Sequence, residues 1–430
     1  MRHTQILVVG AGPAGIAAAT AAAKANRAVS ILDDNPAPGG QIWRNGIASS
    51  GQKENTFRDA ALAQLHASGV RLVMGWRVFD APAPNILSAI SGDNVEHIRY
   101  DKLILATGAR ERFLPFPGWT LPGVFGAGGL QALAKGGFPV AGKRVVVAGS
   151  GPLLVAVAAH LREDGANIVS VTEQASLGQM MSFAPALLSS PTKLWQGLQY
   201  KAKLGSAPYR TGCWPIRALG KTHLTAVRLT NGSRTWEEPC DFLACGFHLV
   251  PNVELATLLG CAFRGDFVQV DSLQQTSLKD IYCAGEPVGI AGLDAALIQG
   301  EIAGIACCGD TARAEAFSSR HRTSIQRFTS RLEAAFRLRT ELRSLADAES
   351  IVCRCEDVRF EQLVPYTSWT EAKLQTRCGM GPCQGRICGP ATRTIFDWKT
   401  TSVRAPLYPV PIDAFCQSDL QIPPTLEETQ

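Results

Sequence analysis

The first 33 residues constrain the fold most strongly, because they place a glycine-rich turn between short apolar segments. A strand predicted at Ile6–Val9 runs into the turn 10–15, and an alanine-rich helix is expected at Ile16–Ala25. A second strand, Val29–Leu32, then ends at Asp33. This order of strand, glycine-rich turn, helix and strand is typical of a dinucleotide-binding unit with a parallel sheet. The sequence therefore predicts an α/β fold.

Each glycine of this turn has a distinct physical role. Gly10 permits a tight turn, Gly12 lets the backbone approach a pyrophosphate, and Gly15 lets the helix pack closely on the strand. Pro13 and Ala14 stand at the start of the helix, where unpaired backbone N–H groups attract phosphate. Glycine-rich turns also join ordinary strands to helices, so this pattern needs support from other segments.

That support comes from acids and glycines farther along the chain. Asp33 lies 18 residues beyond Gly15, where a carboxylate can accept a hydrogen bond from a ribose hydroxyl, and Asp34 follows it. A Gly-Gly-Gln string comes next, one predicted strand ends in Ala-Thr-Gly, and another ends in Gly-Glu before a glycine-rich helix start. These segments add the candidate binding residues Gly40, Gln41, Ala106, Thr107, Gly108, Gly285, Glu286 and Leu293.

A second unit of the same kind begins near Arg144. Its turn reads Gly-Ser-Gly-Pro-Leu-Leu, so Leu154 stands where the third glycine is expected and should push helix and strand apart. Glu173, near the end of the next strand, would repel the extra phosphate of NADP. Two interpretations follow: a nicotinamide site, or a scaffold without nicotinamide, which we favour. A strand ending at 244–246 is expected to return the chain to the first domain.

Taken together, these motifs resemble the flavoproteins with two dinucleotide-binding domains, the group of glutathione-reductase-like and thioredoxin-reductase-like enzymes. The resemblance implies FAD in the first domain, with Asp33 at the adenosine ribose and Glu286 at the ribityl or pyrophosphate region. The family more often has Asp at the second of these positions. Thioredoxin-reductase-like members also need a Cys-x-x-Cys disulfide, which this sequence lacks. A dithiol reductase is therefore not expected.

Charge and cysteine usage exclude several classes of protein. The net charge is only +5, and the arginine excess is concentrated at 313–343, so no nucleic-acid partner is expected. A helix is predicted at Thr311–Leu345 from apolar residues spaced three or four apart. We expect no secretory signal and no transmembrane segment. The 13 cysteines of so large a chain then indicate reduced thiols in the cytoplasm, with peripheral association to the inner membrane through an electron acceptor as a further option.

Five cysteines crowd into 36 residues near the C-terminus. They are Cys353, Cys355, Cys378, Cys383 and Cys388. A two-iron cluster needs four thiolates that converge on a small space, and glycines nearby let backbone amides reach its sulfurs. A structural zinc site with the same thiolates is the competing interpretation. Two pairs with four-residue gaps fit the second half of the site, Cys378 with Cys383 or Cys383 with Cys388.

The cysteine motifs resemble the module named for bacterioferritin-associated ferredoxin: Cys-x-Cys, a short helical stretch, then a second cysteine pair. The small free-standing ferredoxin has Cys-x-x-Cys as that second pair, and this chain departs from it. The string Gly-Met-Gly-Pro-Cys-Gln-Gly-Arg-x-Cys also occurs in flavoprotein subunits without a cysteine at position 378. The resemblance therefore implies a [2Fe-2S] cluster held by Cys353, Cys355, Cys383 and Cys388, with Cys378 as a neighbour.

Residues 1 to about 400 resemble, as a whole, the A-type subunit of bacterial opine oxidases, with relatives in hydrogen cyanide synthase, D-hydroxyproline dehydrogenase and the alpha chain of sarcosine oxidase. The resemblance implies an oxidoreductase acting on CH–NH groups, in which a D-amino-acid-oxidase-like B subunit oxidises the amine. It also implies electron relay through this chain, an FMN at a subunit interface, and a small ferredoxin-like third subunit. No catalytic acid or base is assigned here.

The expected domains are an FAD-binding domain at 1–115 and 245–310, a nicotinamide-domain-like unit at 116–244, and a small α-rich [2Fe-2S] module at 347–400. A helical linker at 311–346 and an extended tail at 401–430 complete the chain. The tail is expected to lack regular structure, and either to lie on a partner or to be disordered. Two other functions stay open: a self-contained NAD(P)H-dependent ferredoxin reductase, and an iron-handling or structural subunit with a vestigial flavin fold.

Overall fold

The computed structural model describes residues 2–44, 56–188, 191–399 and 403–416. The first domain is built on a seven-stranded sheet in the order β3-β2-β1-β6-β5-β4, with β19 paired to β6. Its strands are β1 (Arg2–Val9), β2 (Val29–Asp33), β3 (Arg71–Met74), β4 (Arg77–Ala83), β5 (Ile86–Ser91), β6 (Asn94–Leu105) and β19 (Ile281–Cys283). The long strand β6 pairs with antiparallel β5 through its first half and with parallel β19 through its last residues.

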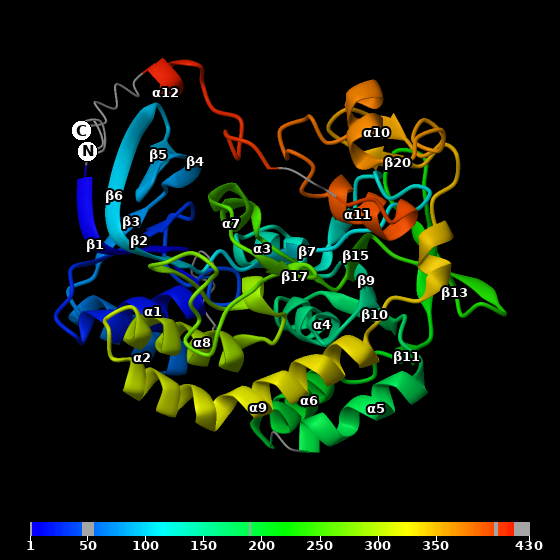
Figure 1. Cartoon of the computed structure of the whole chain (residues 1–430). Helices are drawn as coiled ribbons and strands as arrows, with labels where there is room; N and C mark the ends of the chain where they lie inside the picture. The colour runs from blue at the N-terminus through cyan, green and yellow to red at the C-terminus, as the bar shows by residue number, and fades with distance from the viewer. Residues whose placement is uncertain (1, 45–55, 189–190, 400–402, 417–430) are drawn as a thin grey trace.

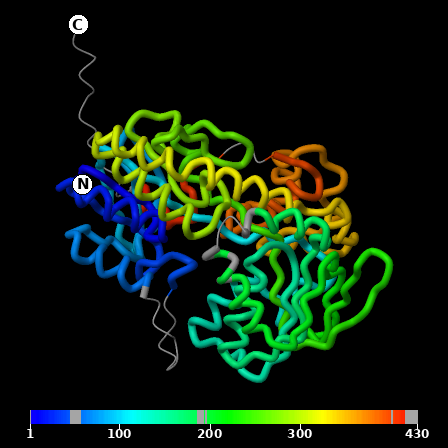
Figure 2. Tube along the Cα trace, turned by 90° about the horizontal axis from the view of Figure 1, so that it is seen from below, coloured from blue at the N-terminus to red at the C-terminus, as the bar shows by residue number. Residues whose placement is uncertain are grey.

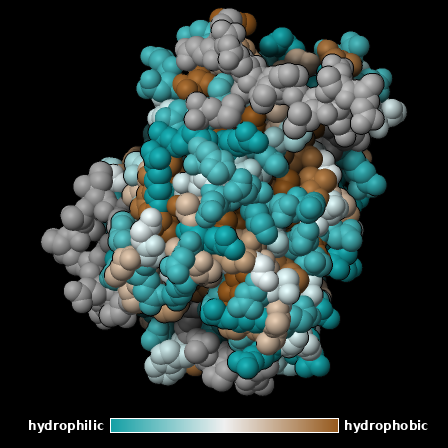
Figure 3. Space-filling view, turned by 60° about the vertical axis from the view of Figure 1, so that its left-hand side comes forward, coloured by the Kyte–Doolittle hydropathy of each residue, from teal (hydrophilic) through white to brown (hydrophobic). Residues whose placement is uncertain are grey.

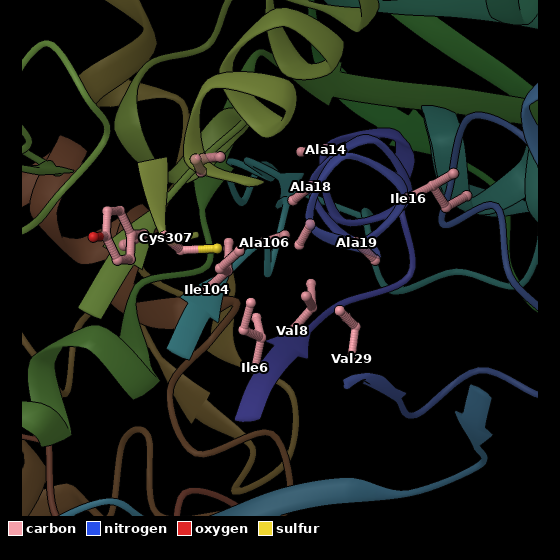
Figure 4. Close-up of a cluster of buried hydrophobic side chains, with 14 of the residues drawn as sticks. Ile6, Val8, Ala14, Ile16, Ala18, Ala19, Val29, Ile104, Ala106 and Cys307 are labelled. Atoms are coloured by element: carbon pink, nitrogen blue, oxygen red, sulfur yellow. The ribbon is translucent and has the colours of Figure 1, made fainter. Parts of the chain in front are cut away.

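Helices α1 (Pro13–Ala23), α2 (Thr56–Ala67) and α8 (Leu293–Ala306) pack in this domain. The alanine-rich surface of α1 and two glycines of α8 let these helices lie very close, since a Cβ at Gly300 would collide with the carbonyl oxygen of Ala14. Figure 4 shows Ile6 and Val8 of β1 facing Ala18 and Ala19 of α1 within the core between them. The predicted strand and helix are present, and the helix begins three residues earlier than expected.

The second domain contains a parallel five-stranded sheet in the order β11-β10-β9-β15-β8. Its strands are β8 (Val124–Gly126), β9 (Arg144–Ser150), β10 (Asn167–Glu173), β11 (Tyr209–Thr211) and β15 (Phe242–Phe247). The boundary expected between residues 244 and 245 therefore falls inside β15, which completes the second sheet before the chain returns. An antiparallel sheet adds β12 (Trp214–Leu219), β13 (Ala226–Thr230) and β14 (Thr235–Pro239).

The remaining elements complete the two domains. The helices of the second domain are α3 (Ala127–Lys135), α4 (Leu153–Glu163), α5 (Leu177–Leu188) and α6 (Pro191–Leu204). Between the domains β7 (Ala109–Glu111) pairs with β16 (Leu249–Pro251), where the chain leaves and re-enters the first domain. The short elements that follow are α7 (Glu254–Leu259), β17 (Phe263–Arg264), β18 (Phe267–Val268) and the 3₁₀ helix η1 (Glu286–Val288).

A 25-residue helix, α9 (Thr311–Ala335), connects the flavoprotein-like body to the cysteine module. It packs against α8 of the first domain and α5 of the second, and Figures 1 and 2 both show it along the underside of the two domains. The predicted helix at Thr311–Leu345 is thus present, but it ends ten residues early and a 3₁₀ helix, η2 (Thr340–Ser344), follows.

The cysteine module has its own small core around Val352, Leu363 and Trp369. It consists of β20 (Ile351–Cys353), β21 (Val358–Arg359), α10 (Trp369–Thr376) and α11 (Cys388–Phe396). The predicted fold class, an α/β fold with two dinucleotide-type domains and a small, mainly helical C-terminal module, is confirmed.

The described part of the tail lies on the chain's own first domain. Leu407 is buried in the core of that domain and its N–H donates to Phe79 of β4 at 2.7 Å. A four-residue helix, α12 (Asp413–Cys416), follows, so the expectation of no regular structure was wrong there. Among the described residues, no helix combines the length and the apolar character needed to cross a membrane. On the face seen in Figure 3, hydrophilic side chains alternate with smaller apolar groups.

Candidate functional site

The glycine-rich turn of the first domain forms an open cradle at the carboxyl end of the parallel strands. Gly10 has φ 108° and lies so close to the end of β6 that a Cβ there would collide with the carbonyl oxygen of Ala106. A Cβ at Gly12 would meet only Gly40 Cα, at 4.0 Å, so the backbone is accessible there. Gly40 lies opposite with φ 58°, and a Cβ on it would stand 2.9 Å from Gly12 Cα. The turn therefore fits a pyrophosphate that a side chain would displace.

Asp33 ends β2 and faces this turn. Its Oδ2 accepts a hydrogen bond from Ala11 N at 2.5 Å, and its Oδ1 accepts one from Asn35 N at 2.7 Å. Asn35 Nδ2 also donates to Oδ1, at 2.6 Å, so of the roughly four acceptor positions of a carboxylate one remains, on Oδ2, for a ribose hydroxyl. Asp34 is placed differently: its carboxylate is exposed and forms a 3.4 Å ion pair with Arg77 of β4. Asp33 thus contacts the turn directly, whereas Asp34 contacts Arg77 and Asn35.

Glu286 lies at the end of β19, next to the start of α8. Its Oε1 accepts a hydrogen bond from Gly292 N at 3.0 Å, whereas its buried Oε2 has no partner among the described residues. Burial raises the pKa of Glu286 to about 7. Buried polar atoms of native proteins are nearly always paired, so this oxygen fits a hydroxyl-bearing ligand such as a ribityl chain. Leu293 begins α8 directly behind Gly292, which has φ 80°.

The predicted segment after β6 is fixed by reciprocal hydrogen bonds. Thr107 Oγ1 donates to Asn252 O at 2.5 Å, and Asn252 Nδ2 donates back to Thr107 O at 2.9 Å. Gly108 follows with φ 69°, and its carbonyl accepts a hydrogen bond from Asn252 N. Gln41 is exposed beside Gly40. Sequence reasoning missed Asn252, because a single Asn in the return strand carries no motif.

The segment that follows α9 contacts the equivalent turn of the second domain. Glu173 is fully buried, with its carboxylate bonded to Gly151 N at 2.7 Å and Ala175 N at 2.8 Å, and burial raises its pKa to about 7. Ser150 Oγ donates to Phe336 O at 3.3 Å. The carbonyl and N–H groups of residues 336–339, just after α9, therefore occupy the space beside this turn.

Gln174 holds this covering segment in place. Its Nε2 donates to Ser150 Oγ at 3.0 Å and to Arg337 O at 3.2 Å, and its Oε1 accepts from Arg339 N at 3.2 Å. The guanidinium of Arg339 also stacks 4.2 Å above the ring of Trp214. Residues 336–339 therefore pack against Ser150 and Gln174 on one side of the second turn.

Three of the five clustered cysteines lie together in the interior of the small module. The Sγ atoms of Cys353, Cys378 and Cys388 are all within 4.8 Å of one another, and all three residues are buried. The thiols of Cys355 and Cys383 interact with each other nearer the surface, where Cys355 is exposed. The five cysteines thus form an inner group of three and an outer pair.

Local backbone geometry brings these cysteines together. Cys353 ends β20, Cys388 begins α11, and Cys378 follows Arg377, whose φ of 65° ends α10. The N–H groups of Gly379 and Glu356 donate to the Cys353 sulfur. Backbone donors to sulfur are typical of iron–sulfur sites, where they tune the potential.

The type of ligand atom indicates which metal group this site can hold. The group is sulfur only, and Gly381 lacks the Cβ that would collide with Cys355 Cβ. Four convergent thiolates suit a two-iron cluster, and they also satisfy zinc. The geometry differs from the predicted ligand set in one respect. Cys378, which was predicted to be only a neighbour of the cluster, lies in the inner group with Cys353 and Cys388. Cys378 reaches this group because of the length of α10 and the turn that follows it. The spacing of cysteines in the sequence does not reveal either feature.

Comparison with known proteins places this geometry in a family. Residues 4–300 match the model of the pyridine nucleotide-disulphide oxidoreductase family. Hydrogen cyanide synthase subunit HcnB of Pseudomonas aeruginosa is 31% identical, over 95% of this chain and 97% of that relative. The A-type subunit of opine oxidase from Agrobacterium tumefaciens is 30% identical, over 94% of this chain and 90% of that relative.

Among solved structures, L-proline dehydrogenase from P. horikoshii superimposes with a TM-score of 0.69. It covers 96% of this chain and 79% of its own, at 18% sequence identity, and so supports the fold alone. The two sequence relatives span nearly the whole chain, including the cysteine module. The chain therefore belongs to the pyridine nucleotide-disulphide oxidoreductase family of flavin-dependent oxidoreductases, in the group that includes HcnB and the A-type subunit of opine oxidase.

Proposed function

We propose that this chain is the FAD- and [2Fe-2S]-containing electron-transfer subunit of a heteromeric amine or opine oxidase. The observation that carries the proposal is the coexistence of an open dinucleotide cradle at Gly12 and a buried sulfur-only site at Cys353 in one compact chain. When bound, FAD accepts an electron pair and releases electrons singly, which suits an iron–sulfur acceptor. The relatives named as subunits of an opine oxidase and of hydrogen cyanide synthase support an assembly with other chains.

In this proposal the residues of the first domain bind and orient FAD. The N–H groups at the start of α1 face the pyrophosphate, Asp33 accepts from the adenosine ribose, and the free oxygen of Glu286 accepts from a ribityl hydroxyl. The other residues proposed to bind FAD are Gly10, Gly12, Pro13, Ala14, Gly15, Asp34, Gly40, Gln41, Ala106, Thr107, Gly108, Gly285 and Leu293. No catalytic acid or base is assigned to this chain.

The proposed cluster ligands are Cys353, Cys355, Cys383 and Cys388. The thiols of Cys353 and Cys388 are close to each other, as are those of Cys355 and Cys383, and the choice of Cys388 over Cys378 follows the sequence resemblance. Cys378 then remains as a buried thiol beside the first pair. Zinc in place of iron would give a colourless module without a paramagnetic reduced state, so iron content and electron paramagnetic resonance distinguish the two.

The proposed partner is a D-amino-acid-oxidase-like subunit that removes two electrons and two protons from the CH–NH group of an opine or another secondary amine. The resulting imine hydrolyses to an amine and an oxo acid, and the electrons pass to this chain and on to an acceptor such as a quinone. An FMN at the interface and a small ferredoxin-like subunit would extend the relay.

The self-contained NAD(P)H-dependent reductase is the second candidate, and one contact weighs against it. It needs nicotinamide at the second turn, where Ser150 and Gln174 are bonded to residues 336–339. Leu154 also replaces the third glycine of that turn.

Co-purification tests the proposal. The chain is expressed with and without the gene for a D-amino-acid-oxidase-like partner, and opine oxidation is followed with an artificial electron acceptor. We expect flavin and iron in this chain in both cases, and activity only in the complex. Opine oxidation by the isolated chain would contradict the relay, whereas rapid bleaching of its flavin by NADH would favour the reductase.

A further inference from the structure

The loop between two of the proposed cluster ligands contacts the first domain at Arg386. Arg386 lies between Cys383 and Cys388, and its side chain is 13% exposed. Its Nη1 donates to Cys383 O at 3.3 Å, within the loop, and its Nε lies 3.9 Å from Glu254 Oε1, at the start of α7. The carbonyl of Arg386 accepts a hydrogen bond from Arg110 Nε at 3.0 Å. The loop is thus tied to the first domain by both its side chain and its backbone.

Arg110 extends this set of contacts toward the Thr107–Gly108 turn of the first domain. Its Nη1 forms a 2.9 Å ion pair with Glu254 Oε1 and donates to Asn252 Oδ1 at 2.7 Å. Asn252 in turn donates to Thr107 O at 2.9 Å. An unbroken series of hydrogen bonds therefore joins the Thr107 backbone to the Arg386 backbone, two residues before Cys388.

The described tail closes the other side of Arg386. Its Nη2 donates to Leu407 O at 2.9 Å, and its guanidinium lies 3.8 Å from the ring centroid of Tyr408. The guanidinium of Arg77 in β4 lies 4.8 Å from the centroid of the same ring. Arg386 is therefore held between the Arg110–Glu254 pair and the tail, and both of these are attached to the first domain.

The side chains of Arg110, Glu254 and Arg386 are largely buried, which favours one arrangement of their charges. The side chains of Arg110 and Glu254 are each 20% exposed, so solvent screens their attraction less than that of a surface pair. Two cations share one carboxylate, and each guanidinium has further acceptors, so the charges are paired in one arrangement. Loss of the carboxylate would leave two neighbouring guanidinium groups without their common counter-ion.

We propose that Arg110, Glu254 and Arg386 form an electron-transfer junction that fixes the Cys383–Cys388 loop on the Thr107–Gly108 turn. They are positioning residues: they hold the cluster at a set separation from the flavin site and supply the bonded path between the two. This inference rests on the proposed function, because it assumes FAD in the first domain and a [2Fe-2S] cluster in the module. The rate of electron transfer between flavin and cluster depends steeply on how the two groups are positioned. A small shift of the loop is therefore sufficient to slow this transfer.

The test uses the full chain with both groups bound. Flavin is reduced by a light pulse with a donor, and the rise of cluster reduction is followed optically in wild type, Glu254→Gln and Glu254→Asp. We expect exchange roughly tenfold slower in Glu254→Gln, with partial recovery in Glu254→Asp, while flavin content, iron content and the resonance spectrum of the reduced cluster stay unchanged. Arg228→Gln, which removes an exposed ion pair with Glu237 in the second domain, is the matched control and should exchange at the wild-type rate.

The outcomes separate this inference from the function on which it rests. Equal rates in wild type and Glu254→Gln would overturn the junction and leave the electron-transfer subunit intact. If Glu254→Gln loses iron, Arg110→Lys takes its place, because it keeps the charge but not the path from Nε to Arg386 O. A wild-type rate in that variant also overturns the junction. A wild-type chain without flavin or without a cluster signal would overturn the proposed function itself.

Discussion

Asp33 and Glu173 end equivalent strands of the two domains, and each accepts a hydrogen bond from the glycine-rich turn of its own domain. Each also accepts one from a backbone N–H two residues later, at Asn35 and Ala175. The surroundings differ, because Gln174 binds residues 336–339 across the second turn, whereas the first turn is open at Gly12. The second turn is thus tied to the segment after α9, whereas the first turn has no such contact among the described residues.

Burial of Glu173 predicts a pH-dependent contribution to stability. Its pKa rises from 4.5 to about 7 in the folded chain, so folding favours the protonated form. The advantage of wild type over Glu173→Gln should be complete below pH 4.5 and fall by about 3 kcal/mol as the pH rises through 7. Thermal midpoints of both proteins between pH 4.5 and 8 measure it. A difference that stays constant with pH would show that Glu173 titrates normally.

Two glycine substitutions in the first turn should fail in different ways. Gly12→Ala places its Cβ in the open cradle, so we expect a normal thermal midpoint and FAD binding at least about tenfold weaker, or about 1.4 kcal/mol. Gly10→Ala must adopt φ 108° and collides with Ala106, so we expect about 1–3 kcal/mol of destabilisation. Flavin fluorescence after denaturation and thermal unfolding measure the two effects. Full flavin content in Gly12→Ala would contradict the cradle.

Single cysteine substitutions should distinguish the ligands from their neighbour. We expect Cys353→Ala, Cys355→Ala, Cys383→Ala and Cys388→Ala each to lose most of the iron, because a two-iron cluster needs all four thiolates. Cys378→Ala should keep its iron, since the remaining thiols still form two close pairs. Iron per chain and the resonance spectrum after reduction are the measurements. Iron loss in Cys378→Ala together with iron retention in Cys355→Ala would reassign the site to the inner cysteines.

The tail should contribute to the stability of the first domain. Leu407→Ala removes a side chain that is 5% exposed, so a loss of about 2–5 kcal/mol is expected. Ile412→Ala, in the same segment but 84% exposed, is the matched control and should change stability by less than about 0.5 kcal/mol. Denaturant unfolding followed by intrinsic fluorescence measures both. Equal stabilities would mean that the tail does not remain docked in solution.

Much of the fold followed from local patterns. The strands and helix around Gly10, and the helix beginning at Thr311, were predicted because their periodicity and turn chemistry are properties of adjacent residues. The end of α9 at Ala335 was not, since apolar spacing continues to Leu345. The chain leaves the helix where the carbonyls of Phe336 and Arg337 bind partners on the second domain.

What the sequence determined by itself is therefore the chemistry: a glycine-rich phosphate turn, an acid after the second strand, and a set of thiols without a redox disulfide. These depend on residue type and short spacing. Only the tertiary structure decided that residues 336–339 cover the second turn, that Cys378 joins Cys353 and Cys388, and that Glu254 binds two arginines from different domains. Such contacts join residues far apart in the chain, 276 positions in the case of Arg110 and Arg386, and depend on how whole elements pack.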